Sequence, residues 1–295
     1  MNRPTLILLV GVPGSGKTTY AEKYIEENPN TAHVSSDKIR EELWGSEATQ
    51  GDNNKVFSLM QSRTIEALNN GQSVVYDATN VTRKDRLYII TLCPKFAKIE
   101  CHIIWAPIET CIERDAARER TVGKEVIDRM LKRFQAPYYD EGIDEIVVVR
   151  PDNFNEYDYT NRIIDMMKIP HDNPHHTLNV FDHCIEANKY IVFKTGSYYS
   201  DIGYAAFYHD VGKPYVKAFV DSKGNTCDIA HYYQHQCVGA WMSYGAGMMG
   251  YARIHAAWLI STHMDPYLNT KYYNKLPAYL KKQIDFLHEA DVNAH

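Results

Sequence analysis

The sequence predicts an α/β domain with a parallel sheet and helices on both of its faces, followed by an all-α domain. In the first half, short apolar runs alternate with longer helical stretches, which is the pattern of strands joined by crossover helices. The second half contains helical stretches and no comparable run of strands. Histidine usage changes at the same point, because only His33 and His102 of the thirteen histidines precede residue 150. A chain of 295 residues can form two domains that each bury a core.

Apolar runs of five to seven residues mark the strands of the first half. We predict strands at Thr5–Val10, Thr31–Ser35, Ser73–Asp77, Ile99–Trp105 and Asp144–Val149. Helical periodicity fills the intervals at Thr18–Glu27, Asp37–Trp44, Asn54–Asn70, Arg83–Leu92, Ile108–Arg120 and Lys124–Phe134.

The second half shows helical periodicity at Asn179–Ile191, Tyr232–Gly245, Ile254–His263 and Leu276–Ala294. The polar segment before it is bracketed by Pro151, Pro170 and Pro174, as is common at a domain boundary. We therefore predict a first domain at residues 1–150, a linker at 151–170 and a second domain at 171–295.

The overall charge and the cysteine usage exclude several classes of protein. A net charge of −5 and a pI of about 6.2 argue against a protein that coats nucleic acid, so any nucleic-acid contact should be local. The six cysteines form no CxxC pair, which favours reduced thiols. The apolar stretch Leu6–Val10 is too short to cross a bilayer. We expect a cytoplasmic protein with no membrane partner.

Residues Gly11–Thr18, GVPGSGKT, match the phosphate-binding P-loop pattern GxxxxGK[ST] between an apolar strand and a helix. Glycines let backbone N–H groups turn inward around phosphates, and the helix N-terminus adds its positive end. We expect Lys17 to reach the β- and γ-phosphates of ATP and Thr18 to hold Mg²⁺. The other residues that we expect to contact the nucleotide from this segment are Gly11, Gly14, Ser15, Gly16 and Thr19.

Acidic residues follow two of the predicted strands. Asp37 stands at a helix start, where it serves either as a helix cap or as a general base that takes a proton from an acceptor hydroxyl, an effect of roughly 10²–10⁴ in rate. Asp77 and Asn80 end the strand at 73–77, and ligands bind at the carboxyl ends of parallel strands. The structural alternative for them is an Asx turn.

Arg114 and Arg118 are four residues apart on a predicted helix, so we expect them to share one face. Paired arginines can stabilise a phosphoryl group in transfer. The alternative is a solvated face on which they form ion pairs with Glu113 and Asp115.

The segments GVPGSGKTT, SSDKIREELWG, DATN followed by Arg83 and Arg86, and RDAAR together resemble the kinase domain of end-healing polynucleotide kinases. The resemblance covers residues 1 to about 150 and implies transfer of the γ-phosphate of ATP to a 5′-hydroxyl of RNA or DNA. It assigns ATP and Mg²⁺ binding to Lys17 and Thr18. Its catalytic Asp and neighbouring Arg fall on Asp37 and Arg40. The strand-end Asp falls on Asp77, and the lid arginines fall on Arg114 and Arg118.

In the second half, His209 and Asp210 are adjacent, and such a pair can ligate one metal ion or let the Asp bridge two. His183, His235, His263 and Asp291 could complete a site of imidazole and carboxylate ligands, which suits Mn, Fe, Ni, Co or Zn. A single helical histidine is usually structural or exposed, so the prediction depends on the whole set.

The order of these residues resembles the HD superfamily of metal-dependent phosphohydrolases. The resemblance covers residues 171–295 and rests on NPHHTLNVFDH, YHDVGKP, HYYQHQCVGA and HEADVNA. It implies the ligands His183, His209, Asp210, His235, His263 and Asp291. His255 competes with His263 for its place. His176 and His231 are candidates for supporting or phosphate contacts, and Lys213 for a phosphate contact. We expect this site to hold two metal ions rather than one. Together they would activate a water molecule for attack on phosphorus.

Together the two resemblances imply a bifunctional end-healing enzyme. One half would phosphorylate 5′-OH ends, and the other would remove a 2′,3′-cyclic phosphate or a terminal 2′- or 3′-phosphate, which prepares RNA or DNA ends for a polynucleotide ligase. One alternative keeps both activities on a nucleotide or another small molecule. A second is an ATP-sensing regulator whose second domain binds a ligand without catalysis.

Overall fold

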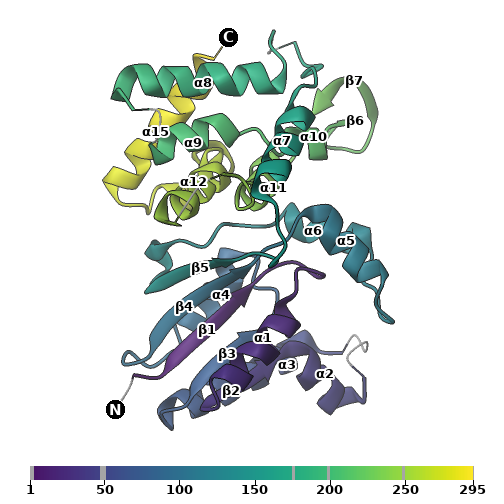
Figure 1. The fold of residues 1–295 in the computed structure, drawn as a ribbon, viewed down its shortest axis with the longest axis vertical. Coiled ribbons are helices and arrows are strands. Elements are labelled where there is room, and N and C mark those ends of the chain that lie inside the picture. The colour runs from purple at the N-terminus through teal and green to yellow at the C-terminus, as the bar shows by residue number, and fades with distance from the viewer. Residues whose placement is uncertain (1–2, 47–50, 175–176, 198–199, 248–249, 295) are drawn as a thin grey trace. The chain divides into compact units, whose positions relative to one another are not determined.

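The computed structural model describes residues 3–46, 51–174, 177–197, 200–247 and 250–294 (Figure 1). The chain divides into two compact units. The first contains Met1–Met130 and Pro137–Asp152, and the second contains Leu131–Ala136 and Asn153–His295.

A five-stranded parallel sheet with the order β2-β3-β1-β4-β5 organises the first unit. Its strands are β1 (Thr5–Val10), β2 (Thr31–Ser35), β3 (Ser73–Asp77), β4 (Lys98–Ile104) and β5 (Glu145–Val149). The five predicted strands are confirmed, three of them with identical bounds. β1 lies between β3 and β4, so the segment that follows β1 leaves from the middle of the sheet.

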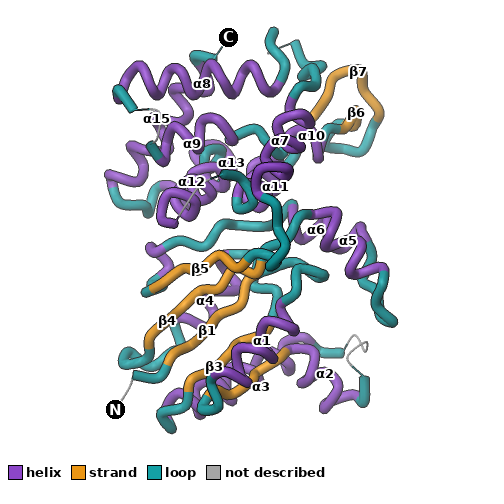
Figure 2. Tube along the Cα trace, viewed as in Figure 1, coloured by secondary structure: helices purple, strands orange, loops and turns teal. Residues whose placement is uncertain are grey.

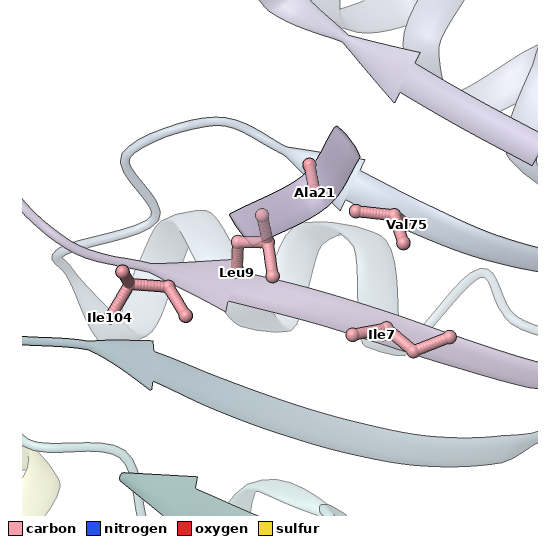
Figure 3. Packing of buried hydrophobic residues seen from close by; sticks show 5 residues of the cluster. All are labelled: Ile7, Leu9, Ala21, Val75 and Ile104. Atoms are coloured by element: carbon pink, nitrogen blue, oxygen red, sulfur yellow. The ribbon is translucent and has the colours of Figure 1, made fainter. Parts of the chain in front are cut away.

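Both faces of the sheet are covered in this unit. Side chains alternate between the faces along a strand, yet every residue of β1 from Leu6 to Val10 is fully buried. On one face, Ala21 of helix α1 (Lys17–Glu27) packs against Ile7, Leu9 and Val75 (Figure 3). This packing attaches the helix that follows the P-loop to the centre of the sheet.

Helices connect the strands of the first unit. Their bounds are α1 Lys17–Glu27, α2 Ser36–Trp44, α3 Asn53–Asn69, α4 Arg83–Ile90, α5 Ile108–Ala116, α6 Lys124–Leu131 and the short 3₁₀ helix η1 Tyr139–Glu141. The fold class predicted for this half is therefore confirmed.

Helices also dominate the second unit. They are α7 Glu156–Met167, α8 Val180–Thr195, α9 Asp201–Tyr208, α10 Lys213–Val216, α11 His235–Ser243, α12 Gly250–Thr262, α13 Asp265–Leu268, α14 Thr270–Tyr273 and α15 Ala278–Val292. α8 packs against α9 and α15, and α11 packs against α12.

The prediction of an all-α second domain was wrong in one segment. Strands β6 (Ala218–Val220) and β7 (Thr226–His231) form an antiparallel hairpin (Figure 2). Its turn is closed by Asp221, whose carboxylate accepts hydrogen bonds from the backbone N–H groups of Lys223 and Asn225, while Gly224 adopts a φ of 89°. Short strands of this kind carry too little periodicity to stand out beside long helices.

The segment predicted as a linker at residues 151–170 is mostly helical. Asn155 caps α7 by accepting hydrogen bonds from the N–H groups of Tyr157 and Asp158. Tyr159, Ile163 and Met167 are buried at four-residue spacing on this helix. The hydroxyl of Tyr159 donates to the carbonyl of Met242. These contacts make α7 part of the second unit. The four-residue spacing of its apolar side chains indicates a helix, but the prolines on either side led to the prediction of a linker.

Candidate functional site

The segment 11–16 connects β1 to α1 and has the backbone conformation of a phosphate-binding loop. Gly14 and Gly16 adopt φ values of 77° and 106°, in the left-handed region that favours glycine. A Cβ on Gly14 would lie 2.1 Å from the carbonyl oxygen of Cys111. The strand, the tight loop and the helix beginning at Lys17 therefore follow one another as the motif requires.

Lys17 lies over this loop. Its ammonium donates a hydrogen bond of 3.0 Å to the carbonyl of Val12. Burial lowers the pKa of Lys17, and the strongest nearby charge that opposes this shift is the carboxylate of Asp77. The hydroxyl of Ser15 is buried without a hydrogen-bond partner. The same short loop thus carries an ammonium and a buried hydroxyl on a glycine-rich backbone, which suits the binding of a polyphosphate.

Thr18 and Thr19, in the first turn of α1, are exposed. A hydroxyl at Thr18 is therefore accessible to a solvated ion. Gly11 donates its backbone N–H to the carbonyl of Thr79, 3.0 Å away, so the start of the loop is tied to the segment that follows β3.

Asp37 lies in the first turn of α2 but does not cap it. The N-cap is Ser35, and no side chain caps the helix. Instead, the Asp37 carboxylate accepts a hydrogen bond of 2.9 Å from Arg40 and keeps 54% of its side chain exposed. Arg40 also donates to the side-chain oxygen of Asn53, 3.2 Å away. The carboxylate is thus held by an arginine and accessible to an acceptor molecule.

Asp77 ends β3 and is almost fully buried, with its Oδ2 atom 3.2 Å from His33 Nε2. Asn80 has a φ of 45° and donates a hydrogen bond of 2.7 Å to the carbonyl of Leu9. Asn80 therefore ties the exit of β3 to β1 through a donated side-chain hydrogen bond.

Arg114 and Arg118 do not share a helix face, which corrects the prediction from their spacing. α5 ends at Ala116, and Arg118 follows it. The reason is Asp115, a buried carboxylate that accepts the backbone N–H groups of Val122 and Gly123 and so turns the chain back. Arg114 points to the P-loop, with Nη1 3.5 Å from the carbonyl of Ser15.

In the second unit, six residues from five separate segments converge. His183 lies on α8, His209 and Asp210 follow α9, His235 begins α11, His263 follows α12, and Asp291 lies on α15. Five of the six are buried, and Asp291 is partly buried.

These residues form two groups of possible metal ligands that share Asp210. The first comprises His183, His209, Asp210 and Asp291, and the second comprises Asp210, His235 and His263. In the first group, Asp291 Oδ1 lies 2.9 Å from His183 Nε2 and 3.3 Å from His209 Nε2. In the second, His235 Nε2 lies 3.2 Å from both His263 Nε2 and Asp210 Oδ1. The opposite oxygen of Asp210 lies 3.4 Å from His209 Nε2.

Backbone carbonyls orient all four histidines. The Nδ1 atoms lie within hydrogen-bond distance of carbonyl oxygens, which only accept, so each ring carries its proton on Nδ1. The pairs are His183 with Ala294, His209 with Ala206, His235 with Tyr232, and His263 with Ile260. Their Nε2 lone pairs consequently face one another at 3.2–3.3 Å within each group. Converging lone pairs repel unless a cation lies between them, so this arrangement fits a metal centre.

The charges at the centre favour bound cations. Burial would lower the pKa of His209, but the Asp210 carboxylate raises it well above its ordinary value, so this ring favours a proton or a metal ion beside Asp210. Burial and the neighbouring His235 and His209 lower the pKa of His263 to about 3, which keeps the imidazole in its ligating, neutral form. Burial alone would raise the pKa of Asp210, but the charges of Lys213 and His209 hold it well below its usual range. Oδ2 of Asp210 is buried without a hydrogen bond of normal geometry, although the Lys213 ammonium lies 2.5 Å away. Imidazole and carboxylate donors of this kind suit Mn, Fe, Co, Ni or Zn.

Lys213 and His171 stand beside the two ligand groups. The Lys213 ammonium lies 3.2 Å from His171 Nε2 and 5.4 Å from the ring centre of Tyr232. His171 Nδ1 lies 2.8 Å from the carbonyl of Leu178. Lys213 was predicted as a phosphate contact, whereas the sequence offers no signal for His171 beyond its position at the start of the histidine-rich half.

The structure also separates the remaining histidines. His255 lies outside both groups, because Nδ1 contacts Asp201 and Nε2 contacts Gln283, each at 3.1 Å. His231 ends β7 and stacks on Tyr233. His176 lies outside the described residues. The geometry therefore places His263, and not His255, with the predicted ligands.

A family model described as an AAA domain matches residues 6–137. The L-seryl-tRNA(Sec) kinase of Methanococcus maripaludis is 28% identical over 179 residues, which are 56% of this chain and 65% of that protein. A solved chain of the Pnkp1/Rnl/Hen1 RNA repair complex is 23% identical, with a TM-score of 0.42, over 45% of this chain and 44% of that chain. A fungal RNA kinase is 14% identical, with a TM-score of 0.39, over 52% of this chain and 40% of that chain.

The chain thus spans less than two thirds of the length of each of these proteins. The family match and the geometry of residues 11–17 identify the first unit as a kinase-like P-loop domain that binds a nucleotide. Among the described residues, no helix has both the length and the apolar composition needed to cross a membrane.

Proposed function

We propose that this chain is a bifunctional nucleic-acid end-healing enzyme, with an ATP-dependent 5′-hydroxyl kinase in the first unit and a metal-dependent phosphohydrolase of the HD type in the second. The observation that carries the proposal is the pair of ligand groups sharing Asp210, in a chain whose other unit is a kinase-like P-loop domain. Each activity acts on phosphate at the end of a strand, and together they convert a broken end into a substrate for a polynucleotide ligase.

In the kinase half, we assign Asp37 as the general base. Its exposed carboxylate takes the proton of the 5′-hydroxyl while the oxygen bonds to the γ-phosphorus of ATP and the bond to the β-phosphate oxygen breaks, which releases ADP. Arg40 holds that carboxylate in place. Lys17 and the loop Gly11–Gly16 bind the phosphates, Thr18 holds Mg²⁺, and Asp77 lies on the nucleotide side. Arg114 and Arg118 bind charge on the phosphoryl group.

In the hydrolase half, His183, His209, Asp210 and Asp291 would hold one divalent transition ion, and Asp210, His235 and His263 a second. Two bound ions supply an activated water and neutralise charge on the phosphate. Lys213, with its ammonium beside Asp210, binds a phosphate oxygen of the substrate. The substrate is a 2′,3′-cyclic phosphate or a terminal 2′- or 3′-phosphate. Hydrolysis of one ester bond would open the cyclic phosphate to a terminal phosphate, and hydrolysis of that monoester would release inorganic phosphate and leave both hydroxyl groups.

A paired assay tests both halves. Protein with Mg²⁺ and labelled ATP should label 5′-OH RNA or DNA oligonucleotides, and with Mn²⁺, Ni²⁺ or Co²⁺ it should release phosphate from 3′-phosphorylated or cyclic-phosphate oligonucleotides. A free nucleoside is the comparison acceptor. Transfer to the nucleoside without transfer to any oligonucleotide would favour the alternative of a small-molecule kinase. ATP binding without transfer or hydrolysis would favour a regulator.

A further inference from the structure

His33 lies between two charged side chains at the nucleotide-binding edge of the sheet. It is on β2, next to β3, in the parallel pairing that sets Ser35 opposite Asp77. Its Nε2 atom lies 3.2 Å from Asp77 Oδ2, and its Nδ1 atom lies 3.2 Å from the ammonium of Lys38. The side chains of His33 and Asp77 are only 10% and 6% exposed.

The partners of His33 determine which of its nitrogens carries the proton. An ammonium has no lone pair and can only donate, so Nδ1 must accept from Lys38. The ring proton is therefore on Nε2 and is donated to Asp77 Oδ2. The Asp77 carboxylate, which only accepts, requires the same tautomer, so the two partners hold the ring from opposite sides and Lys38 fixes its orientation.

Asp77 ends β3 two residues before Thr79, whose carbonyl accepts the backbone N–H of Gly11 at the start of the P-loop, and its charge acts on Lys17 of that loop. We propose that His33 is a positioning residue for nucleotide binding, which holds Asp77 at this edge of the P-loop, and that Lys38 fixes the ring of His33 in the orientation that does so. This inference rests on the proposed kinase site. It adds two residues to that site, neither of which belongs to the P-loop.

The test is a double-mutant cycle read by binding of a fluorescent ATP analogue with Mg²⁺, with no acceptor present. His33→Leu should weaken binding about 10-fold or more, as loss of an outer partner does at other ligand sites. His33→Gln should restore most of the affinity, because its amide donates to Asp77. Lys38→Met should weaken binding in the wild-type background and have no further effect in the His33→Gln background, where no imidazole remains for Lys38 to orient.

His102→Leu is the matched control, since it removes another buried histidine of the same sheet, one bonded to Tyr20 and Glu100. It should lower the melting temperature and leave nucleotide affinity unchanged. Unchanged affinity in His33→Leu, or Lys38→Met effects that are equal in both backgrounds, would overturn the inference. Lys38 is exposed, so Lys38→Met should fold, and its nucleotide affinity can be measured even if His33→Leu does not fold. Because the readout needs no acceptor, a failure to phosphorylate oligonucleotides would count against the proposed function and leave this result intact.

Discussion

Arg86 and Glu141 form a bidentate ion pair in which Nε and Nη2 of the guanidinium lie 2.8 and 2.7 Å from the two carboxylate oxygens. Both side chains are fully buried, at 0% and 1% exposure. A third bond, from Nη1 to the carbonyl of Asn80, ties the pair to the segment that leaves β3. Arg86 was part of the sequence resemblance, and its place in the structure is that of a support beneath the candidate kinase site.

The first prediction concerns this ion pair. Glu141→Gln should destabilise the first unit by about 3–5 kcal/mol, because it removes the negative charge that forms the bidentate pair with the buried Arg86. The double variant Arg86→Met/Glu141→Leu should recover most of that loss, since both charges are removed. Glu145→Gln, which alters the exposed pair with Lys98, should cost less than about 1 kcal/mol. Denaturant unfolding measures all three, and equal costs for Glu141→Gln and Glu145→Gln would contradict the argument.

The second prediction concerns Asp37. Asp37→Asn should lower kinase turnover by roughly 10²–10⁴, because an amide cannot take the proton of the acceptor hydroxyl. Phosphatase activity should stay at the wild-type level. Glu42→Gln is the control, because Glu42 lies on the same helix and forms an exposed ion pair with Arg63. Kinase activity that survives in Asp37→Asn would remove Asp37 from the role of general base, and loss of both activities would mean that the units do not work independently.

The third prediction concerns Asp210, which both ligand groups share. Asp210→Ala should release bound transition metal and abolish phosphatase activity, while kinase activity persists. Asp165→Ala, which removes an exposed carboxylate on α7, should leave the metal content, the phosphatase activity and the kinase activity unchanged. Elemental analysis of the purified protein, followed by separate assays of the two activities, gives the result. Full phosphatase activity in Asp210→Ala would show that the proposed hydrolase site is wrong.

The fourth prediction separates His263 from His255. His263→Ala should remove one nitrogen of the second ligand group and lower the metal content toward one ion per chain. His255→Ala should keep the full metal content and lower only the melting temperature, because it breaks the contacts with Asp201 and Gln283. The same metal loss in both variants would contradict the division into two groups that the structure describes.

Local patterns were sufficient to predict much of this protein. The P-loop match located the turn between β1 and α1, since glycine spacing and a following helix are local properties. Apolar runs located all five strands of the first unit, and the central strand β1 is buried on both faces. Prediction failed in two segments. The prolines around α7 led to the prediction of a linker, and the short strands β6 and β7 carry too little periodicity to be distinguished from the helical segments around them. The helix predicted to extend to Arg120 ended at Ala116 because of the distant bonds of Asp115.

The sequence alone predicted which residues would carry the proposed chemistry: the lysine and glycines of the P-loop, Asp37 with Arg40, and the histidines and carboxylates in their order along the chain. Only the tertiary structure decided how these residues meet. It divided the ligands into two groups around Asp210, placed His263 rather than His255 among them, paired Arg86 with Glu141, and brought His33 to Asp77. The physical reason is that helices and strands follow from neighbours in the chain, whereas ring orientation, burial and ion pairing depend on groups that only folding brings together.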